Sequence, residues 1–356
     1  MTPEHEPALA LCAQDAGTSL ESVRVLRREG HYKSRQLYVS TGGREPTHVV
    51  KLNDMAWRPE REYEGYRFLC RAFADARTDA GRDGPRVGAI RPVGYGALPD
   101  FLVTAYQPGR SVRPDFDAGV GLRAGAEARW IASERARSLA AWSARVRRFE
   151  PQREGGPDAV GLIDDLVRHR LEIRAHVGAR AASAAAAGVA LAERLLEGLS
   201  PEEHERLSWR FATHGDLAPQ NFHLGPDGTL YALDLENFAF MPHHRDLCMF
   251  RARLEAYALR GPLPRRHATA IWRAYLDETH KQAPEETDAL LVIAYLQRLL
   301  SHIAWMRNPE YLAGDRAAAS WPNRIRQRLW MGGRLAWLRR LPGDPARAAE
   351  RFRDVL

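Results

Sequence analysis

Two aspartates and an asparagine in the second half of the chain have a spacing that suits magnesium chemistry. Asn221 follows Asp216 by five residues, and Asp234 follows Asn221 by thirteen. Residues 222–224 and 229–233 have strand character on either side of a Pro-Asp-Gly turn, which predicts a hairpin. A hairpin of that length returns Asn221 and Asp234 to the same end of a small sheet. Hard oxygen ligands placed side by side suit Mg²⁺ and a phosphorylated substrate.

The same stretch resembles a known family in both residue types and spacing. Positions 214–221 read His-Gly-Asp, four further residues and Asn, and an apolar residue precedes Asp234. This pattern resembles the catalytic and metal-binding loops of aminoglycoside phosphotransferase and choline-kinase-like enzymes, which are small-molecule kinases with a protein-kinase-like fold. The resemblance spans roughly residues 22–310, although its specific residues are few. It implies ATP and Mg²⁺ as cofactors and a hydroxyl group of a small molecule or sugar as the acceptor.

Asp216 is the expected catalytic base. Phosphoryl transfer has a loose transition state, so the protein mainly positions the hydroxyl and neutralises charge. A carboxylate within hydrogen-bond reach of the acceptor hydroxyl orients it and takes its proton late. Asn221 and Asp234 are the expected Mg²⁺ ligands. The alternative is that these are ordinary turn and helix-cap residues.

Other residues around the loop are expected to support it. We expect His214 to be structural, with a hydrogen bond to the backbone near Asp234, and Gly215 to supply an unusual backbone angle. Glu236 lies two residues past Asp234, close to the expected metal or acceptor. Asp246 matches the aspartate that, in the resembled family, begins a helix and braces the catalytic loop.

A lysine and a glutamate in the first hundred residues complete the predicted site. Lys51 lies in a predicted strand, and three glutamates lie in the first turns of the helix that follows. In the resembled family, a strand lysine that contacts the nucleotide phosphates is held by a helix glutamate, and Glu62 matches it best. Ser34 ends a loop at residues 30–34 that has a single glycine, and we expect Ser34 or nearby backbone amides to meet the β-phosphate. The alternative is that Lys51 and Glu62 are ordinary solvated residues.

The elements that must position these residues predict an α+β protein. Strand patterns fall at residues 22–27, 36–40, 48–52, 90–93 and 101–105. Helical spacing covers residues 58–76. We expect an N-terminal extension at residues 1–20 and a nucleotide-binding N-lobe at 21–107, with a five-stranded sheet and one helix.

Residues 108–356 are expected to form a larger, mainly helical C-lobe that binds the acceptor. Helical patterns fall at residues 132–147, 160–177, 181–199, 246–259, 265–278 and 285–306. The last of these is apolar on most sides, so we expect it at the centre of the lobe. The predicted fold class is therefore bilobal and protein-kinase-like, with a small antiparallel-sheet N-lobe and a larger helical C-lobe.

Composition excludes several other classes of protein. The 356 residues are 45% hydrophobic and 27% charged, with a net charge of +7, and they contain no recognised nucleic-acid motif. We expect neither a signal peptide nor a transmembrane segment, and three widely spaced cysteines, Cys12, Cys70 and Cys248, are expected to be inert thiols. These features favour a cytoplasmic protein that does not bind nucleic acid.

Residues 321–341 are rich in arginine, with interleaved tryptophans and leucines and no acid. One hypothesis is peripheral contact with an anionic membrane. The favoured hypothesis is a C-terminal helix whose tryptophans contact the lobe while its arginines face water. Gly332 and Gly333 are expected to interrupt this helix.

The leading functional hypothesis is an ATP-dependent phosphotransferase that acts on a hydroxyl of a small molecule or sugar. One alternative is a kinase of a cell-envelope glycan or glycolipid at the membrane surface. A second is a nucleotide-binding pseudokinase that serves as a binding module. The arginine-rich composition tilts the acceptor toward a neutral or anionic sugar-like compound, and the sequence leaves its identity, the choice of ATP or GTP, and the oligomeric state open.

Overall fold

The computed structural model describes residues 5–30, 34–53, 59–74, 85–97, 100–153, 155–156, 158–242, 245–305, 321–341 and 343–354. They form two compact units, each made from two stretches of the chain. The first unit combines Met1–Arg113 with His214–Ala239, and the second combines Pro114–Thr213 with Phe240–Leu356. The lobe boundary near residue 108 stays a prediction.

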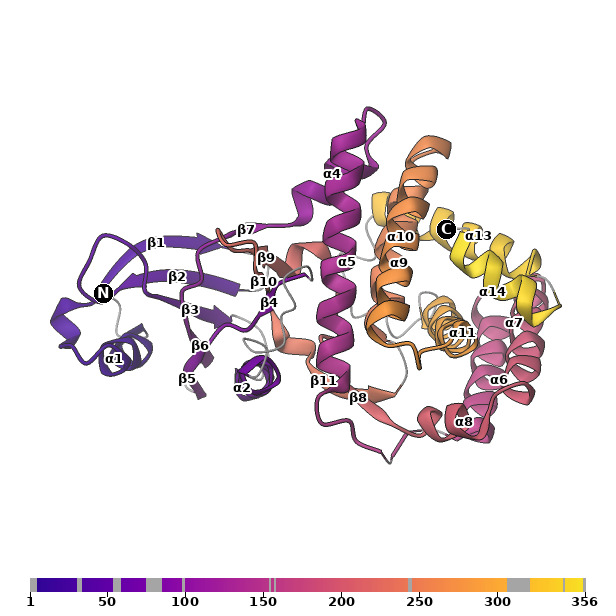
Figure 1. Ribbon diagram of the computed structural model, residues 1–356, viewed down its shortest axis with the longest axis horizontal. Coiled ribbons are helices and arrows are strands. Elements are labelled where there is room, and N and C mark those ends of the chain that lie inside the picture. The colour runs from indigo at the N-terminus through magenta and orange to yellow at the C-terminus, as the bar shows by residue number, and fades with distance from the viewer. Residues whose placement is uncertain are drawn as a thin grey trace. The chain divides into compact units, whose positions relative to one another are not determined.

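A five-stranded antiparallel sheet forms the larger part of the first unit (Figure 1). Its order is β1-β2-β3-β6-β5, and every neighbouring pair is antiparallel. The strands are β1 (Arg24–Gly30), β2 (Ser34–Ser40), β3 (His48–Asn53), β5 (Pro92–Ala97) and β6 (Asp100–Ala105). The predicted strand at residues 90–93 is displaced to β5. Gly94 and Gly96 weaken its strand pattern, yet a Cβ at either position would come within 3 Å of a neighbouring side chain.

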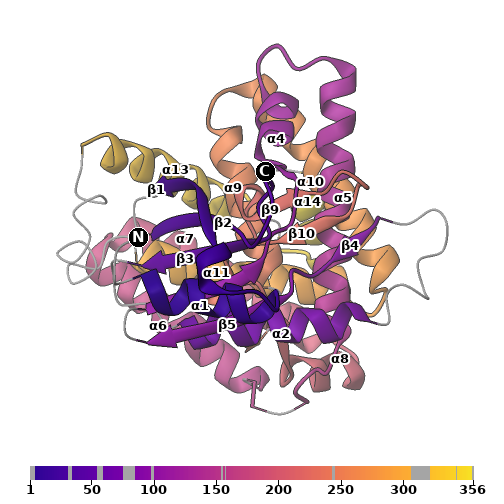
Figure 2. The same ribbon diagram turned by 90° about the vertical axis from the view of Figure 1, so that its left-hand side faces the viewer.

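Two helices contact this sheet, and both touch β5 and β6 (Figure 2). Helix α1 (Glu6–Asp15) buries Leu9 and Cys12 in the sheet's apolar core, so the predicted extension contains a helix that belongs to this unit. Helix α2 (Pro59–Ala74) corresponds to the predicted helix and begins with a proline and acidic residues, which suit a helix N-terminus.

A second, four-stranded sheet carries the predicted hairpin. Its order is β4-β10-β9-β7, with β4 at Val87–Gly88, β10 at Leu230–Ala232, β9 at Phe222–Leu224 and β7 at Arg110–Ser111. In the hairpin, Phe222 pairs with Ala232. The backbone N–H of Leu233 also donates to the carbonyl of Asn221 at 2.8 Å. The register therefore holds the residues before Asp234 beside Asn221, as predicted.

The second unit is mainly helical. Its helices are α4 (Arg113–Val120), α5 (Ala126–Arg148), α6 (Ala159–His176), α7 (Ala179–Glu197), α8 (Pro201–Leu207), α9 (Arg245–Ala258), α10 (Pro262–Gln282), α11 (Asp288–Trp305), α13 (Trp321–Arg339) and α14 (Pro345–Asp354). Strands β8 (Arg210–Thr213) and β11 (Ala239–Pro242) pair as a short ribbon. Helix α11 is buried along most of its length, which confirms its predicted central place.

Helix α13 corrects one detail of the sequence analysis. It runs without a break through Gly332 and Gly333, although two glycines cost about 1 kcal/mol each in a helix. Contacts with the rest of the unit outweigh that cost, because Leu335, Trp337 and Leu338 are buried. Within the part of α13 whose side chains are described, Trp337 contacts the unit as predicted, but the prediction that the arginines face water is wrong for Arg334, which is buried.

Candidate active site

Lys51, in the middle of β3, lies between two carboxylates from distant parts of the chain. Its Nζ donates to Glu62 Oε2 on α2 at 2.9 Å and to Asp234 Oδ1 at 2.5 Å. Glu62 is 1% exposed, whereas the side chain of Asp234 is 44% exposed. The buried glutamate holds the lysine, and the lysine points its charge at a carboxylate that solvent can reach.

Burial and charge act in opposite directions on this cluster. Burial raises the pKa of Glu62 to about 7, opposed by the charge of Lys51 and reinforced by those of Asp234 and Glu236. Burial alone would lower the pKa of Lys51, but Glu62 and Asp234 outweigh it and raise that pKa. Lys51 is therefore a cation shared between two acids, and Glu236 lies near enough to add a third negative charge.

Asp216 and Asn221 contact each other directly. Asn221 Nδ2 donates to the backbone carbonyl of Asp216 at 3.0 Å and to its carboxylate Oδ2 at 3.2 Å. The short 3-10 helix η3 (Pro219–Asn221) turns the chain between them. Asn221 is 7% exposed, so its amide holds the Asp216 carboxylate in one orientation. These bonds use the amide nitrogen of Asn221 and leave its carbonyl oxygen for another partner.

His214 and Gly215 fix the backbone that precedes Asp216. His214 is fully buried, and its Nε2 donates to the carbonyl of Leu233 at 2.9 Å. This bond ties the start of the loop to the residue before Asp234, which is the structural contact that the sequence predicted. Gly215 has φ +82°, and a Cβ there would lie 2.2 Å from the carbonyl oxygen of Asn237. Only glycine fits that position without moving the backbone.

Asp234 has a left-handed backbone conformation, with φ 58° and ψ 57°. A non-glycine residue in this region is strained and often functional. Two residues of α2 that the sequence analysis did not assign hold this turn. The hydroxyl of Tyr66 accepts the backbone N–H of Asp234 at 3.2 Å, and Arg61 Nε donates to the carbonyl of Phe238 at 2.9 Å. Both positions looked like ordinary helix residues, because backbone contacts leave no spacing pattern.

The donor set suits Mg²⁺ coordinated partly by phosphate oxygens. Lys51 contacts one oxygen of Asp234, so the other oxygen and the side-chain oxygen of Asn221 are available as ligands. No group of three or more His, Cys, Asp or Glu residues that could hold a metal occurs among the described residues. Mg²⁺ does not need such a cage, because it keeps several waters and shares its coordination with phosphates.

The remaining predicted residues lie in different places. Ser34 is the first residue of β2 and pairs with Asn53. The loop before it, at residues 31–33, lies outside the described residues, so the phosphate contacts there stay a prediction.

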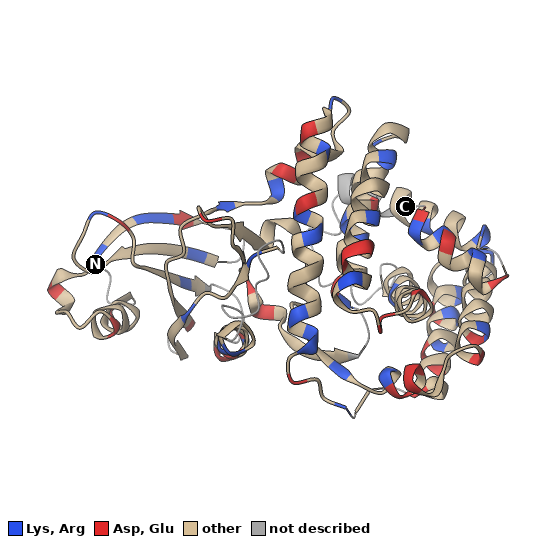
Figure 3. Cartoon of the chain, in the orientation of Figure 1, with Lys and Arg blue, Asp and Glu red and all other residues tan. Residues whose placement is uncertain are grey.

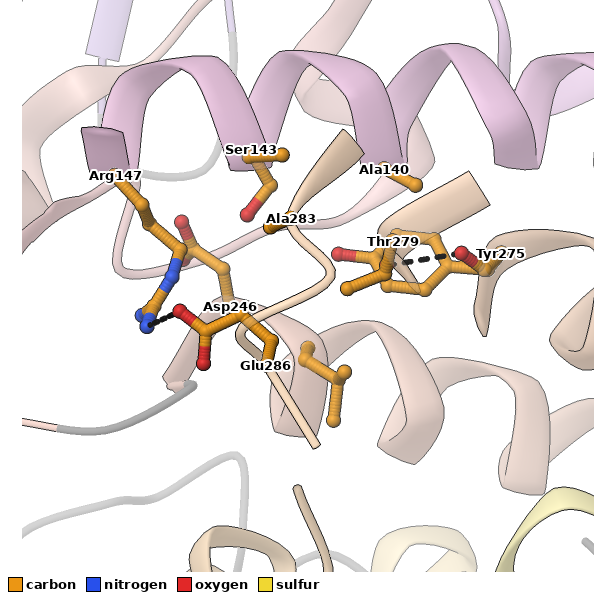
Figure 4. Close-up of a pocket in the computed structure, with 10 residues that line it drawn as sticks. Ala140, Ser143, Arg147, Asp246, Tyr275, Thr279, Ala283 and Glu286 are labelled. Carbon is orange, nitrogen blue, oxygen red and sulfur yellow. Dashed lines mark hydrogen bonds and ion pairs between the residues drawn. The ribbon is translucent and has the colours of Figure 1, made fainter. Parts of the chain in front are cut away.

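Asp246 lies in the first turn of α9 and is 2% exposed. It lines a cavity of about 10 Å³, room for about one water, together with Tyr275, Arg147 and Glu286 (Figure 4). Arg147 and Glu286 form an ion pair at 3.0 Å on one side of this cavity. The structure brings Asp246 into a polar network inside the second unit, and its predicted bracing of the catalytic loop stays a prediction.

Comparisons with known proteins agree with the fold. No protein-family model and no curated protein sequence matches the chain. A solved structure of glucosamine kinase in complex with glucosamine, ADP and inorganic phosphate matches with a TM-score of 0.57 and 16% identity, over 95% of this chain and 83% of that chain. Another crystal form of glucosamine kinase matches with a TM-score of 0.56 and 17% identity, over 95% and 85%.

A weaker match is ethanolamine kinase from Plasmodium vivax, with a TM-score of 0.49 and 12% identity, over 88% of this chain and 83% of that chain. The glucosamine kinase structures confirm the predicted fold class, α+β with an antiparallel-sheet part and a larger helical part. The fold is thus the one seen in these glucosamine kinase structures. Among the described residues, no helix has the length and apolar character needed to cross a membrane.

Proposed function

We propose that the protein is a phosphotransferase that moves the γ-phosphoryl group of ATP to a hydroxyl of a small molecule or sugar. One observation carries the proposal: Lys51 joins the buried Glu62 to the solvent-accessible Asp234. In the same unit, Asp216 is held by Asn221. A buried glutamate that holds a lysine against an open carboxylate is a costly arrangement for stability alone, and it suits charge neutralisation during phosphoryl transfer.

Each residue has a separate role in the proposed reaction. Bound Mg²⁺ would neutralise charge on the nucleotide phosphates, with Asn221 and Asp234 as its protein ligands. Lys51 holds phosphate oxygens through its ammonium group, and Glu62 keeps that group in place. Asp216 accepts a hydrogen bond from the acceptor hydroxyl and takes its proton as the new P–O bond forms and the bond between the γ-phosphorus and ADP breaks.

A sugar or amino sugar is the acceptor class that we favour. The fold is shared with a kinase that was solved with glucosamine and ADP, and the net charge of +7 gives no reason to expect a polycationic acceptor. The identity at 16% is too low to transfer the acceptor itself. We therefore propose a class of reaction and a class of acceptor, and not a particular acceptor.

The test is ADP release with Mg²⁺ and a panel of sugars, amino sugars and amino alcohols. We expect turnover by the natural protein with at least one acceptor and a fall of about 10²–10⁴-fold in kcat for Asp216→Ala, the range typical of a positioned base. Asp227→Ala is the matched control, because Asp227 lies in the exposed turn of the same hairpin. We expect this control to keep full turnover.

Two outcomes would contradict the proposal. One is nucleotide binding with no turnover on any acceptor of the panel, which would favour a binding module. The other is an equal loss of kcat in Asp216→Ala and Asp227→Ala.

A further inference from the structure

The second unit contains a larger pocket that the proposed reaction does not use. Its volume is about 320 Å³, at the lower end of the range for small-molecule sites. All of its lining residues fall between positions 255 and 351. They come from α9, α10, α11, α13 and α14, from the connection into α10 and from the turn that follows α13. The pocket therefore lies wholly within the second unit.

The lining of this pocket is basic. Arg265, Arg334, Arg340 and Arg351 line it, against one acid, Glu255. Figure 3 shows that basic residues also recur along helices of the second unit such as α5. At the pocket, the excess of basic over acidic side chains is concentrated around one cavity, with four positive charges and one negative charge.

The one acid is already neutralised by neighbours. Glu255 accepts hydrogen bonds from Arg334 Nε at 2.7 Å and Arg251 Nε at 3.2 Å, and also from the hydroxyl of Tyr295. No carboxylate among the described residues forms an ion pair with Arg265, Arg340 or Arg351. The positive charge of these arginines is therefore available to a ligand.

Two buried donors in the lining point to the same conclusion. Trp337 is 8% exposed, and its indole N–H has no acceptor among the residues that the structure describes. Arg351 Nε is likewise buried without a described partner. A buried donor without an acceptor costs about 1–3 kcal/mol of stability. A ligand whose acceptor atoms bind these two donors would remove that cost.

Aromatic rings form the remaining walls. Trp330 lies under the guanidinium of Arg334, and Trp337 meets the ring of Tyr295 edge to face. Flat aromatic surfaces beside fixed cations suit a ring that carries negative charge. The same surfaces give little to a bare inorganic ion.

We propose that this arginine–tryptophan pocket binds an anionic, ring-bearing small molecule, such as a sugar that carries a phosphate, sulfate or carboxylate group. The arginines take the charged group, and the tryptophans take the ring and one of its acceptor oxygens. This proposal does not depend on the phosphotransferase activity. Either an acceptor or a separate effector of the protein could supply that chemistry.

The test follows the indole N–H signal of Trp337 in a ¹H–¹⁵N spectrum, assigned with Trp337→Phe. Titration with glucose 6-phosphate is expected to shift this signal saturably, whereas the buried Trp142 of the same unit serves as the unmoved reference. Glucose at equal concentration is expected to leave the Trp337 signal unchanged.

A charge-matched pair of variants gives the control. Arg265→Gln combined with Arg340→Gln removes two pocket charges and should weaken binding of glucose 6-phosphate by at least about tenfold. Arg266→Gln combined with Arg339→Gln removes two neighbouring exposed charges outside the lining and should leave the dissociation constant unchanged.

Three outcomes would overturn the proposal: no saturable shift of the Trp337 signal, equal weakening in both double variants, or an equal shift with inorganic phosphate. Binding to Asp216→Ala should match that of the natural protein, so failure of the catalytic proposal leaves this result intact. Consumption of glucose 6-phosphate with ADP release would mark it as an acceptor, and binding without consumption would mark an effector.

Discussion

Each unit of the protein contains a cluster of charged side chains, and the two clusters have opposite excess charge. In the first unit, one cation, Lys51, is shared by Glu62 and Asp234. In the second, one acid, Glu255, is shared by Arg251 and Arg334. The first cluster therefore has an excess negative charge and favours a metal cation, while the second has an excess positive charge and favours an anion.

The clusters also differ in access and strain. Asp234 has 44% of its side chain exposed and a left-handed backbone, whereas the side chain of Glu255 is 11% exposed and lies near the C-terminal end of α9. Removing the shared partner from a buried cluster leaves buried charges uncompensated and costs stability, whereas a strained, open cluster keeps a ligand atom available. We therefore expect the closed cluster to matter most for stability and the open cluster to matter most for chemistry.

The largest effect on stability is expected for Glu255→Gln. Loss of this acid leaves Arg251 and Arg334 as buried charges without their common partner, which should lower the free energy of unfolding by about 3–5 kcal/mol. Urea unfolding measures the change. Glu64→Gln is the control, because Glu64 and its partner Arg67 are both more than half exposed, and its effect should stay below about 0.5 kcal/mol. Equal losses in the two variants would refute the contrast.

A smaller effect is expected from the pH dependence of His302, which contacts the closed cluster. Burial lowers its pKa to about 2, with Arg334, Arg298 and Arg253 adding to the shift. Arg334 Nη1 also donates to His302 Nδ1 at 3.4 Å, which requires a neutral ring. A depressed pKa gives stability that is complete above pH 6.5 and is lost as the pH falls below that value, because the unfolded chain binds the proton first.

For His302 this loss should reach about 2 kcal/mol by pH 5. Urea unfolding of natural protein and His302→Gln between pH 5 and pH 8 measures it. In this pH range, the free energy of unfolding should depend less steeply on pH in the variant, by the amount that the binding of about one proton accounts for. Identical slopes for both proteins would show that the pKa of His302 is the same in the folded and unfolded states.

The smallest effect on stability is expected at the open cluster. Asp234→Gly removes an exposed partner of Lys51, worth about 0–1 kcal/mol, and relieves left-handed strain of about 1–2 kcal/mol. At the middle of these ranges the free energy of unfolding should rise by about 1 kcal/mol, while ADP release is lost. Asp234→Ala keeps the strain and should be about 1 kcal/mol less stable than Asp234→Gly. A loss above about 3 kcal/mol in Asp234→Gly would make this residue structural.

The candidate site was largely predictable because its residues fall into short, regular spacings. The hairpin brings Asn221 close to the residues before Asp234, as its length predicted. The contact of His214 with the backbone was predicted from the resemblance to the family motif. The pairing of Lys51 with Glu62 was predicted from the resemblance, and the two side chains form a hydrogen bond in the structure. Tyr66 and Arg61 were missed because they act on backbone atoms, which any helix residue of suitable reach can contact.

The fold was less predictable where glycine and burial compete. The sequence predicted a strand at residues 90–93, but β5 extends through Gly94 and Gly96. At both positions a neighbouring side chain occupies the space that a Cβ atom would need. In α13, contacts of the buried face override two glycines. In both cases tertiary contacts outweigh local propensity. The sequence did not predict the basic pocket, because the residues that line it come from five different helices and the segments next to them.

The discontinuous first unit has a consequence for the order of events during synthesis. Lys51 and Asp234 are separated by 183 residues. At a translation rate of about 5–20 residues per second, Asp234 is therefore added about 10–40 s after Lys51. During that interval β4 and β7 also lack β10 and β9, their partners in the small sheet. Residues 114–213 are therefore synthesised before the hairpin that completes the first unit and its candidate site.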